Sequence, residues 1–309
     1  MSKLRQAGGP HEDRVEPAEP VTEREKERSQ EDRDFMPVIV KRTDEARRHP
    51  DDILQTAIEE GYEQLNRRPF SLFLSAVGAG LILGFVAMAV AVVSTALAGV
   101  ESEVVRRVAV ALVYPLGFVV CIMSGTELFT EHTATAVYPV LDRRAGFGRL
   151  VRLWVIVGAG NLVGTLASAT LLTLAEDVIG ARSGYIMIGH HLVGVDLLPL
   201  VVSALLAGWL MALGAWLILA TPPRTSQIVS IYIVTFLIGL GGLHHSIAGS
   251  AEMLTAYLIS DQFTLTQSLR FIGVALIGNL AGGSLFVAAL NYAHIRHSQA
   301  EPDATSTGS

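Results

Sequence analysis

The sequence is poor in cysteine and, beyond residue 68, poor in charge. Cys121 is the only cysteine, so an intramolecular disulfide is excluded. The three lysines are Lys3, Lys26 and Lys41, and more than half of the 23 basic and 29 acidic residues lie within residues 1–68. With a net charge of −6 and no clustered basic face, the composition gives no case for a nucleic-acid partner.

Apolar residues are abundant instead. Hydrophobic residues make up 50% of the chain, and its mean hydropathy is +0.44. Six apolar segments are each near or above the roughly 20 residues that cross a bilayer. They cover residues 69–97, 104–140, 148–175, 198–221, 226–258 and 267–294. This pattern predicts an all-α membrane protein with six transmembrane helices.

The remaining residues divide into flanking segments. Residues 1–50 are rich in Glu, Arg, Pro and Gln, which predicts a disordered, charged cytoplasmic tail. No basic stretch followed by an apolar core precedes residue 69, so a secretory signal peptide is not expected. Residues 51–68 place apolar side chains at helical spacing beside acidic ones, which predicts an amphipathic helix at the membrane surface. The six-span domain is expected over residues 69–297, with a C-terminal tail at 298–309.

The second and fifth apolar segments are too long, and too polar in the middle, for one plain helix each. SGTELFTEHT at 124–133 interrupts the second, and GLGGLHHS at 239–246 interrupts the fifth. Each unsatisfied polar group in hydrocarbon costs several kcal/mol, so broken, polar segments at mid-depth are typical of a solute pathway. We expect Gly241→Leu to block the pathway or unfold the protein.

The two breaks occupy equivalent places in two halves of three segments each. The third and sixth segments also share a motif, GNLVG around Asn161 and GNLAGG around Asn279. Because each half has an odd number of spans, the second half enters from the opposite side. The sequence therefore predicts two inverted three-helix repeats, with the functional site where the broken helices cross. The two asparagines are expected to bridge helices.

Arginines in the short flanks predict the orientation. One side carries Arg67, Arg68, Arg143, Arg144, Arg149, Arg152, Arg224 and Arg296, and the other carries Arg106, Arg107, Arg182 and Arg270. This asymmetry predicts a multi-pass protein of the cytoplasmic (inner) membrane with both termini in the cytoplasm.

Three motifs make the chain similar to the formate/nitrite transporter family. YPLGFVVCIMSGTELFTEHT at 114–133 resembles the family's second-span segment, and GLGGLHHSIAGSAEML at 239–254 resembles its central-histidine segment. GNLVG and GNLAGG resemble its third- and sixth-span signatures. The resemblance covers residues 69–295 and implies an aquaporin-like fold and a homopentamer with one pore per subunit. It also implies passage of a small monovalent anion such as formate or nitrite.

The resemblance also implies pore residues. His245 matches the family's central histidine, and Thr130 matches the threonine that faces it. Phe118, Phe129 and Ile238 match apolar positions that narrow the pore. An anion cannot cheaply enter an apolar constriction, but the neutral acid that it forms by accepting a proton can. Histidine, with an unperturbed pKa of about 6.5, suits such proton-assisted passage.

Carboxyl groups near the breaks complicate the anion interpretation. Glu127, Glu131 and Glu252 lie there, and an ionised carboxylate would repel an anion. They can pair with the nearby histidines His132, His244 or His245, stay protonated through burial, or cap the following half-helix. His244 is a further pore candidate, although hydrogen bonding between helices is its competing role.

The chain also lacks donors that the familiar formate channels carry. They have a lysine and an asparagine in or near the fourth span, where this chain has no lysine and Gly208 takes the asparagine's place. A second family asparagine, four residues after the central histidine, is Gly249 here. These departures weaken the attraction for anions.

Two other functions fit parts of the pattern. The same channel passing ammonium or a small neutral solute would tolerate the carboxylates better. A membrane-embedded metalloenzyme would use the pairs His190/His191 and His244/His245 with a glutamate. However, HExxH and GxxxxGK motifs are absent from the sequence, and adjacent histidines on a helix point about 100° apart. The sequence favours a channel over an enzyme, with no cofactor and no metal.

Overall fold

The structure is a computed structural model that describes residues 49–221 and 223–299. Every element in this described part is a helix. The predicted charged tail at 1–50 lies outside the described residues except for its last two positions, and so does most of the predicted tail at 298–309.

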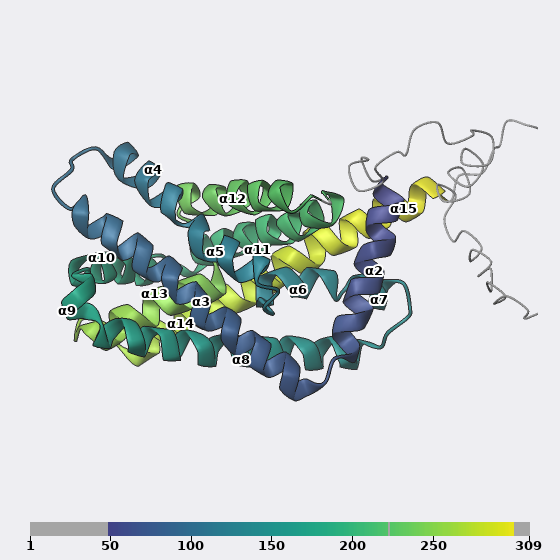
Figure 1. The fold of residues 1–309 in the computed structure, drawn as a ribbon, viewed down its shortest axis with the longest axis horizontal. Coiled ribbons are helices and arrows are strands. Elements are labelled where there is room, and N and C mark those ends of the chain that lie inside the picture. The colour runs from purple at the N-terminus through teal and green to yellow at the C-terminus, as the bar shows by residue number, and fades with distance from the viewer. Residues whose placement is uncertain (1–48, 222, 300–309) are drawn as a thin grey trace, which may run out of the picture. The chain divides into compact units, whose positions relative to one another are not determined.

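Within the described residues, six helical segments are long and apolar enough to cross a membrane, which confirms the six predicted spans (Figure 1). The first four are α3 (Pro69–Ala96), α4 with α5 (Glu103–Val113 and Pro115–Met123), α8 (Phe147–Leu174) and α11 (Leu197–Ala220). The last two are α12 (Arg224–Gly241) and α14 with η1 and α15 (Leu265–Ala281, Gly282–Ala289 and Leu290–Gln299). Pro115 separates α4 from α5, because proline has no N–H to continue the helical ladder.

Shorter helices complete the broken spans and flank the two halves. After the first break come α6 (Phe129–Thr135) and α7 (Tyr138–Leu141), and after the second comes α13 (Ser246–Ile259). The short α9 (Glu176–Ile179) and the longer α10 (Arg182–Val193) lead into the second half.

The amphipathic helix expected over residues 51–68 occurs as α2 (Pro50–Asn66). A capping box at His49 and Pro50 at the first turn begin it. Its apolar face, which includes Leu54, Ile58 and Leu65, is buried, and α2 contacts α6, α7 and α11. Protein rather than lipid therefore covers the apolar face of this helix.

The inverted repeat appears in the hydrogen bonds of two asparagines. Asn161 Oδ1 accepts the N–H of Phe129 (2.8 Å), and its Nδ2 donates to the carbonyls of Ala76 and Glu127 (both 2.8 Å). Asn279 does the same in the other half, where its Oδ1 accepts the N–H of Ser246 (2.7 Å). Its Nδ2 donates to the carbonyls of Ala204 (2.7 Å) and His244 (3.0 Å). The asparagines therefore bridge helices as expected.

Serine and glycine residues repeat this equivalence. The Ser75 hydroxyl accepts the N–H of Glu127 (3.2 Å), and the Ser203 hydroxyl accepts that of His244 (3.1 Å). A Cβ at Gly80 would collide with the backbone of Asn161, and one at Gly208 would collide with that of Asn279. Glu127 and His244 thus hold equivalent positions in the two repeats, directly before the residue at each crossing point.

The flanking helices belong to the repeat as well. In Figure 1, α2 and α10 lie at opposite ends of the spans. α2 contacts α11, α6 and α8, and α10 makes the matching contacts with α3, α13 and α14. Each repeat is therefore one short amphipathic helix followed by three spans.

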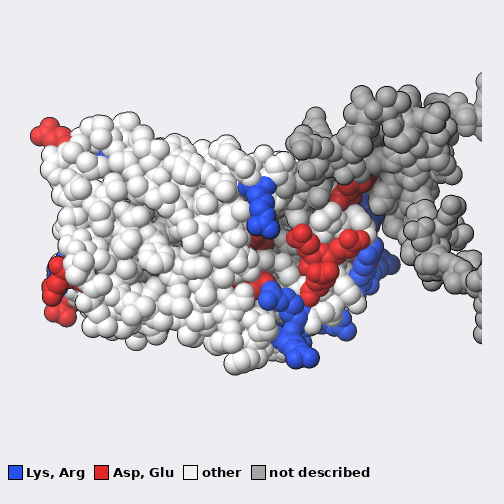
Figure 2. Space-filling model, viewed as in Figure 1, with Lys and Arg blue, Asp and Glu red and all other residues white. Residues whose placement is uncertain are grey.

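Charged side chains mark the two ends of the transmembrane region (Figure 2). On the face shown in Figure 2, Asp, Glu, Lys and Arg gather near both ends, and the broad surface between them is almost uncharged. The arginines assigned to one side contact the α2 end, since Arg152 donates to the Leu65 carbonyl (2.7 Å) and Arg149 to Asn66 Oδ1 (3.2 Å). Large apolar side chains such as Phe85, Val155 and Ile277 are exposed on the spans. This is the surface expected of a multi-pass membrane protein.

We predict that Asn161→Ala and Asn279→Ala each destabilise the protein to a similar extent. Each change leaves one backbone N–H and two carbonyls without their partner, and one such buried group costs about 1–3 kcal/mol. Thermal unfolding of the detergent-solubilised variants measures the loss. Asn66→Ala, at an exposed position, is the matched control. Equal melting temperatures for the Asn161, Asn279 and Asn66 variants would contradict the prediction.

Candidate functional site

The site lies where the two helix breaks meet. The first break runs from Ser124 to Leu128, with Gly125 at φ 69°. The second begins at Gly242, which ends α12 with φ 59° and a left-handed backbone. Glycine adopts this conformation without steric penalty. The conformational requirement for glycine therefore falls on Gly242, whereas Gly241 is the last residue of α12.

Thr130 and His245 meet across the repeats. Thr130 Oγ1 lies 2.8 Å from His245 Nε2, and both side chains are buried. The Phe118 ring stands edge-on to the imidazole, with ring centroids 4.9 Å apart and an interplanar angle of 83°. The residues that the resemblance pairs are thus in contact, although they are 115 positions apart.

The local fold fixes the tautomer of His245. His245 is the N-cap of α13, and its Nδ1 accepts the backbone N–H of Ala248 (3.2 Å). An amide N–H can only donate, so Nδ1 carries no proton in this arrangement. The proton of the neutral ring lies on Nε2, which donates to Thr130 Oγ1. The Thr130 hydroxyl hydrogen remains available for a second acceptor.

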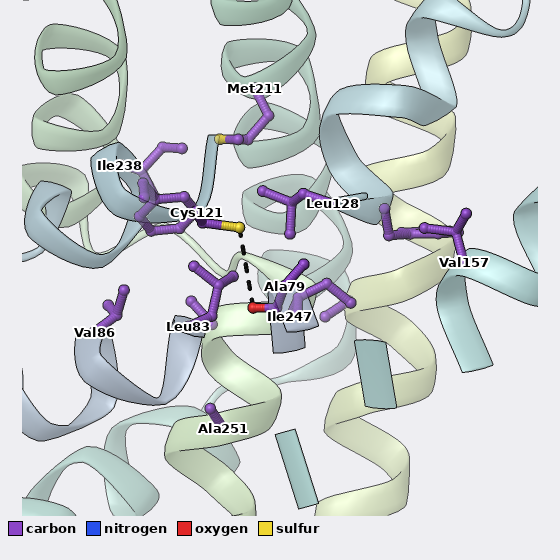
Figure 3. Packing of buried hydrophobic residues seen from close by; sticks show 14 of the residues in the cluster. Ala79, Leu83, Val86, Cys121, Leu128, Val157, Met211, Ile238, Ile247 and Ala251 are labelled. Carbon is purple, nitrogen blue, oxygen red and sulfur yellow. Dashed lines mark hydrogen bonds between the residues drawn. The ribbon is translucent and has the colours of Figure 1, made fainter. Parts of the chain in front are cut away.

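Apolar side chains surround the pair. Figure 3 shows the packing of buried apolar residues from several spans and from the first break, among them Cys121, Leu128, Met211 and Ile238. Ile238 and Phe118 are fully buried. The Phe129 ring packs toward Gly158 of α8, 3.5 Å from where a Cβ would lie. An unpaired charge at this depth would lose its hydration without gaining polar contacts.

A cavity of about 380 Å³ leads from the α10 end down to His245. Glu103, Arg106 and Arg107 of α4 lie at its rim, where both arginines pair with Glu103 (2.7 and 3.2 Å). Its inner part is lined by Tyr114, Ile238, His244, His245, Gly249 and Glu252. We call this space the vestibule.

Glu127 and Glu131 lie away from the vestibule. Glu127 is buried, pairs with Arg67, and lies 3.1 Å from His132 Nδ1 through its Oε2. The backbone N-cap of α6 is Leu128 and has no side-chain cap, so Glu127 does not cap the half-helix. Glu131, in the first turn of α6, borders a small gap beside Met211 and Thr235.

The vestibule contains the third carboxyl group, Glu252, on the same face of α13 as His245 and Gly249. At Gly249, a Cβ would lie 2.7 Å from Phe271 Cζ, so the phenyl ring occupies the space of a side chain. At Gly208, the backbone of Asn279 does so. At both positions where the family has an asparagine, the packing around the glycine therefore leaves no room for a side chain.

The four histidines of the metalloenzyme hypothesis fall into different surroundings. His190 bonds Gln262 (2.7 Å) and packs on Phe263, while His191 stacks on His244 with ring centroids 5.5 Å apart and an angle of 9°. Both His190 and His191 are exposed. Across the described residues, no three His, Cys, Asp or Glu side chains are grouped to hold a metal.

Sequence reasoning missed Tyr114, Ser203 and the role of α10. Tyr114 lines the vestibule and packs on Phe118 at 5.3 Å between ring centroids. Ser203 Oγ lies 2.8 Å from His244 Nδ1. The repeat contained a signal for Ser203: Ser75 and Ser203 each lie five positions before a matched glycine, Gly80 and Gly208 respectively.

A sequence profile described as "Formate/nitrite transporter" matches residues 51–293. The chain belongs to the formate/nitrite transporter family. It is 32% identical over 245 residues to the inner membrane protein YfdC of Escherichia coli (strain K12), covering 77% of this chain and 76% of that protein. It is 23% identical over 261 residues to the formate channel FocA of the same strain, covering 77% of this chain and 91% of FocA.

Solved structures agree with the fold. A chain described as an FNT family ion channel aligns with a TM-score of 0.68 at 19% identity, covering 82% of this chain and 100% of that one. A pentameric formate channel with formate bound aligns with a TM-score of 0.61 at 20% identity, covering 74% and 98%. The aquaporin-like fold with inverted repeats is thereby confirmed.

We predict that His245 is the Nε2–H tautomer in the resting protein. The Ala248 N–H fixes this state by occupying Nδ1. Nitrogen NMR of histidine-labelled protein in lipid, with the His245 signal assigned by its loss in His245→Ala, measures it. A nitrogen spectrum that shows His245 protonated at Nδ1 and unprotonated at Nε2 would contradict the hydrogen-bond assignment.

Proposed function

We propose that the protein is a membrane channel for a small monovalent anion, such as formate or nitrite, and that the anion passes the His245–Thr130 pair. The observation that carries this proposal is the vestibule that ends on His245, where the second repeat contacts Thr130 of the first. Family membership and the names of the relatives, which include formate channels, support the same substrate class.

The pair offers hydrogen-bond donors where the surroundings are most apolar. An anion that reaches the pair can take the Nε2–H of His245 and the hydroxyl hydrogen of Thr130, both of which would otherwise be hard to supply at this depth. Phe118 and Ile238 exclude water there, so these donors replace much of the lost hydration.

Proton assistance by His245 has a defined structural requirement. Nε2 already carries a proton, so an incoming proton must bind Nδ1 and displace the Ala248 N–H. The resulting imidazolium can pass its Nε2 proton to the anion, which then crosses the apolar region as a neutral acid and leaves the ring with its proton on Nδ1. The ring returns to its resting state when Nε2 takes a proton back from the acid or from solvent and Nδ1 releases its own, so the first turn of α13 would loosen and re-form in each cycle.

We place the protein in the cytoplasmic membrane as a homopentamer with one pore per subunit, in line with the pentameric formate channel that it resembles in fold. The arginine asymmetry puts both termini and the α2 end in the cytoplasm. The vestibule then opens to the other side of the membrane.

We predict that formate flux into proteoliposomes rises as the pH falls from 8 to 5 and that His245→Ala removes this rise while the protein stays folded. More protons at low pH favour the imidazolium, and the variant cannot form it. Protein-free liposomes correct for free diffusion of formic acid. Wild-type flux from the variant at every pH would eliminate His245 as the proton donor.

Thr130→Val and Thr130→Ser form a matched pair for the same experiment. Valine keeps the shape but removes the hydroxyl, so flux should fall by about 10-fold or more, the equivalent of one hydrogen bond to a charged group. Serine keeps the hydroxyl and should retain most of the flux. Equal flux from both variants would show that the hydroxyl is not used.

Glu252 favours a second candidate, ammonium. A carboxylate in the vestibule attracts a cation and repels an anion. For an anion channel, Glu252→Gln should keep or raise formate flux, because it removes a negative charge from the path. For an ammonium channel, the same change should lower ammonium flux. Parallel measurements of formate and ammonium flux with wild type and Glu252→Gln therefore separate the two candidates.

A further inference from the structure

His244 is a second buried histidine of the vestibule, and its hydrogen bonds differ from those of His245. His244 is 4% exposed and belongs to the vestibule lining. Its backbone N–H and its Nδ1 are both engaged by Ser203 (3.1 and 2.8 Å), whereas its Nε2 has no hydrogen-bond partner. A buried ring nitrogen without a partner is costly, and in native proteins such atoms pair with a water or a ligand.

The equivalent position in the first repeat carries a different side chain. Glu127 is the equivalent of His244 in the first half, because both are held by the matching serine and asparagine. Glu127 Oε1 pairs with Arg67, whereas its Oε2 lies next to His132 and, like His244 Nε2, has no hydrogen-bond partner. Only His244 lines the vestibule, so a group from the vestibule can reach its unpaired nitrogen.

The charges around the vestibule indicate the sign of that group. At the rim, Arg106 and Arg107 share one carboxylate, Glu103, which leaves an excess of one positive charge. Such a rim raises the local concentration of anions. Glu252 is the opposing charge in the vestibule, and it lies on α13 beyond His245 and Gly249 rather than beside His244 along the chain.

We propose that His244 forms an anion-docking subsite in the vestibule, where its Nε2–H binds a small carboxylate or similar oxyanion before it reaches His245. The proposal assigns the Ser203 hydroxyl as the donor to Nδ1, and with that assignment the ring proton lies on Nε2, ready for an acceptor. This subsite rests on the proposed function for its role in transport, but the binding itself does not require flux.

His191 covers the subsite. Its ring stacks on His244 at 5.5 Å with an angle of 9°, and the side chain is exposed on α10. Two parallel imidazoles direct their ring nitrogens along parallel planes, which is unsuitable for a metal ion held between them. The exposed His191 ring can slide aside for an anion without disturbing the buried Ser203–His244 contact.

Formate binding to the full-length protein in lipid nanodiscs tests the proposal, with line broadening of 13C-formate as the readout. His244→Phe keeps an aromatic ring against His191 and Phe271 but removes the N–H donor, and it should weaken formate binding about 10-fold. His244→Gln supplies an amide donor and should restore most of the binding. His190→Phe, on the same helix as His191 but bonded to Gln262, is the matched control and should bind like wild type.

The background variant His245→Ala separates this subsite from the central pair. In that background, His244→Phe should again weaken the remaining formate binding about 10-fold. If His244→Phe binds formate as tightly as wild type, Nε2 is only hydrated and the proposal is overturned. If His244-dependent binding is present but wild-type proteoliposomes pass no formate, the subsite stands and the proposed function fails. Absence of binding to wild type overturns the subsite directly.

Discussion

The structure depends on satisfying backbone groups where two membrane helices are broken. A break at mid-depth frees N–H and carbonyl groups that hydrocarbon cannot bind, and each would cost several kcal/mol. Asn161 and Asn279 take up two of these groups each and also bond a carbonyl of a neighbouring unbroken span, and Ser75 and Ser203 take up one more freed group in each half. The close approach of helices that this needs is the reason for glycine at positions 80 and 208.

The same frame leads to different side chains at the two crossing points. Leu128 follows Glu127 at the first crossing, and His245 follows His244 at the second. An imidazole placed there is also the N-cap of α13, so its Nδ1 is used to hold the helix and its Nε2 is directed at Thr130. The ring therefore caps α13 with one edge and contacts Thr130 with the other, which couples any proton on Nδ1 to the α13 cap.

The electrostatics of the two halves differ more than their backbones. On the α2 side, a buried carboxylate pairs with Arg67 and lies beside His132. On the α10 side, two histidines stack near a rim of two arginines and one glutamate, with Glu252 further in. The inverted repeat thus places a carboxylate–arginine pair at one crossing point and stacked histidines beside an open cavity at the other.

The sequence alone determined the six spans, the two breaks and the inverted repeat, because hydropathy, matched interruptions and the shared GN motif are local signals. It also paired His245 with Thr130 through the family motif. The sequence offered His132, five residues away, among the partners of the carboxyl groups, but only the tertiary structure decided that Arg67 pairs with Glu127 and that His244 packs on His191, since these residues are far apart in the chain. Such pairings depend on helix rotation and depth, which a linear pattern does not contain. The structure likewise showed that Gly242 has the left-handed backbone of the second break, and it covered the apolar face of α2 with protein, because burial is decided by neighbouring helices rather than by amphipathic spacing.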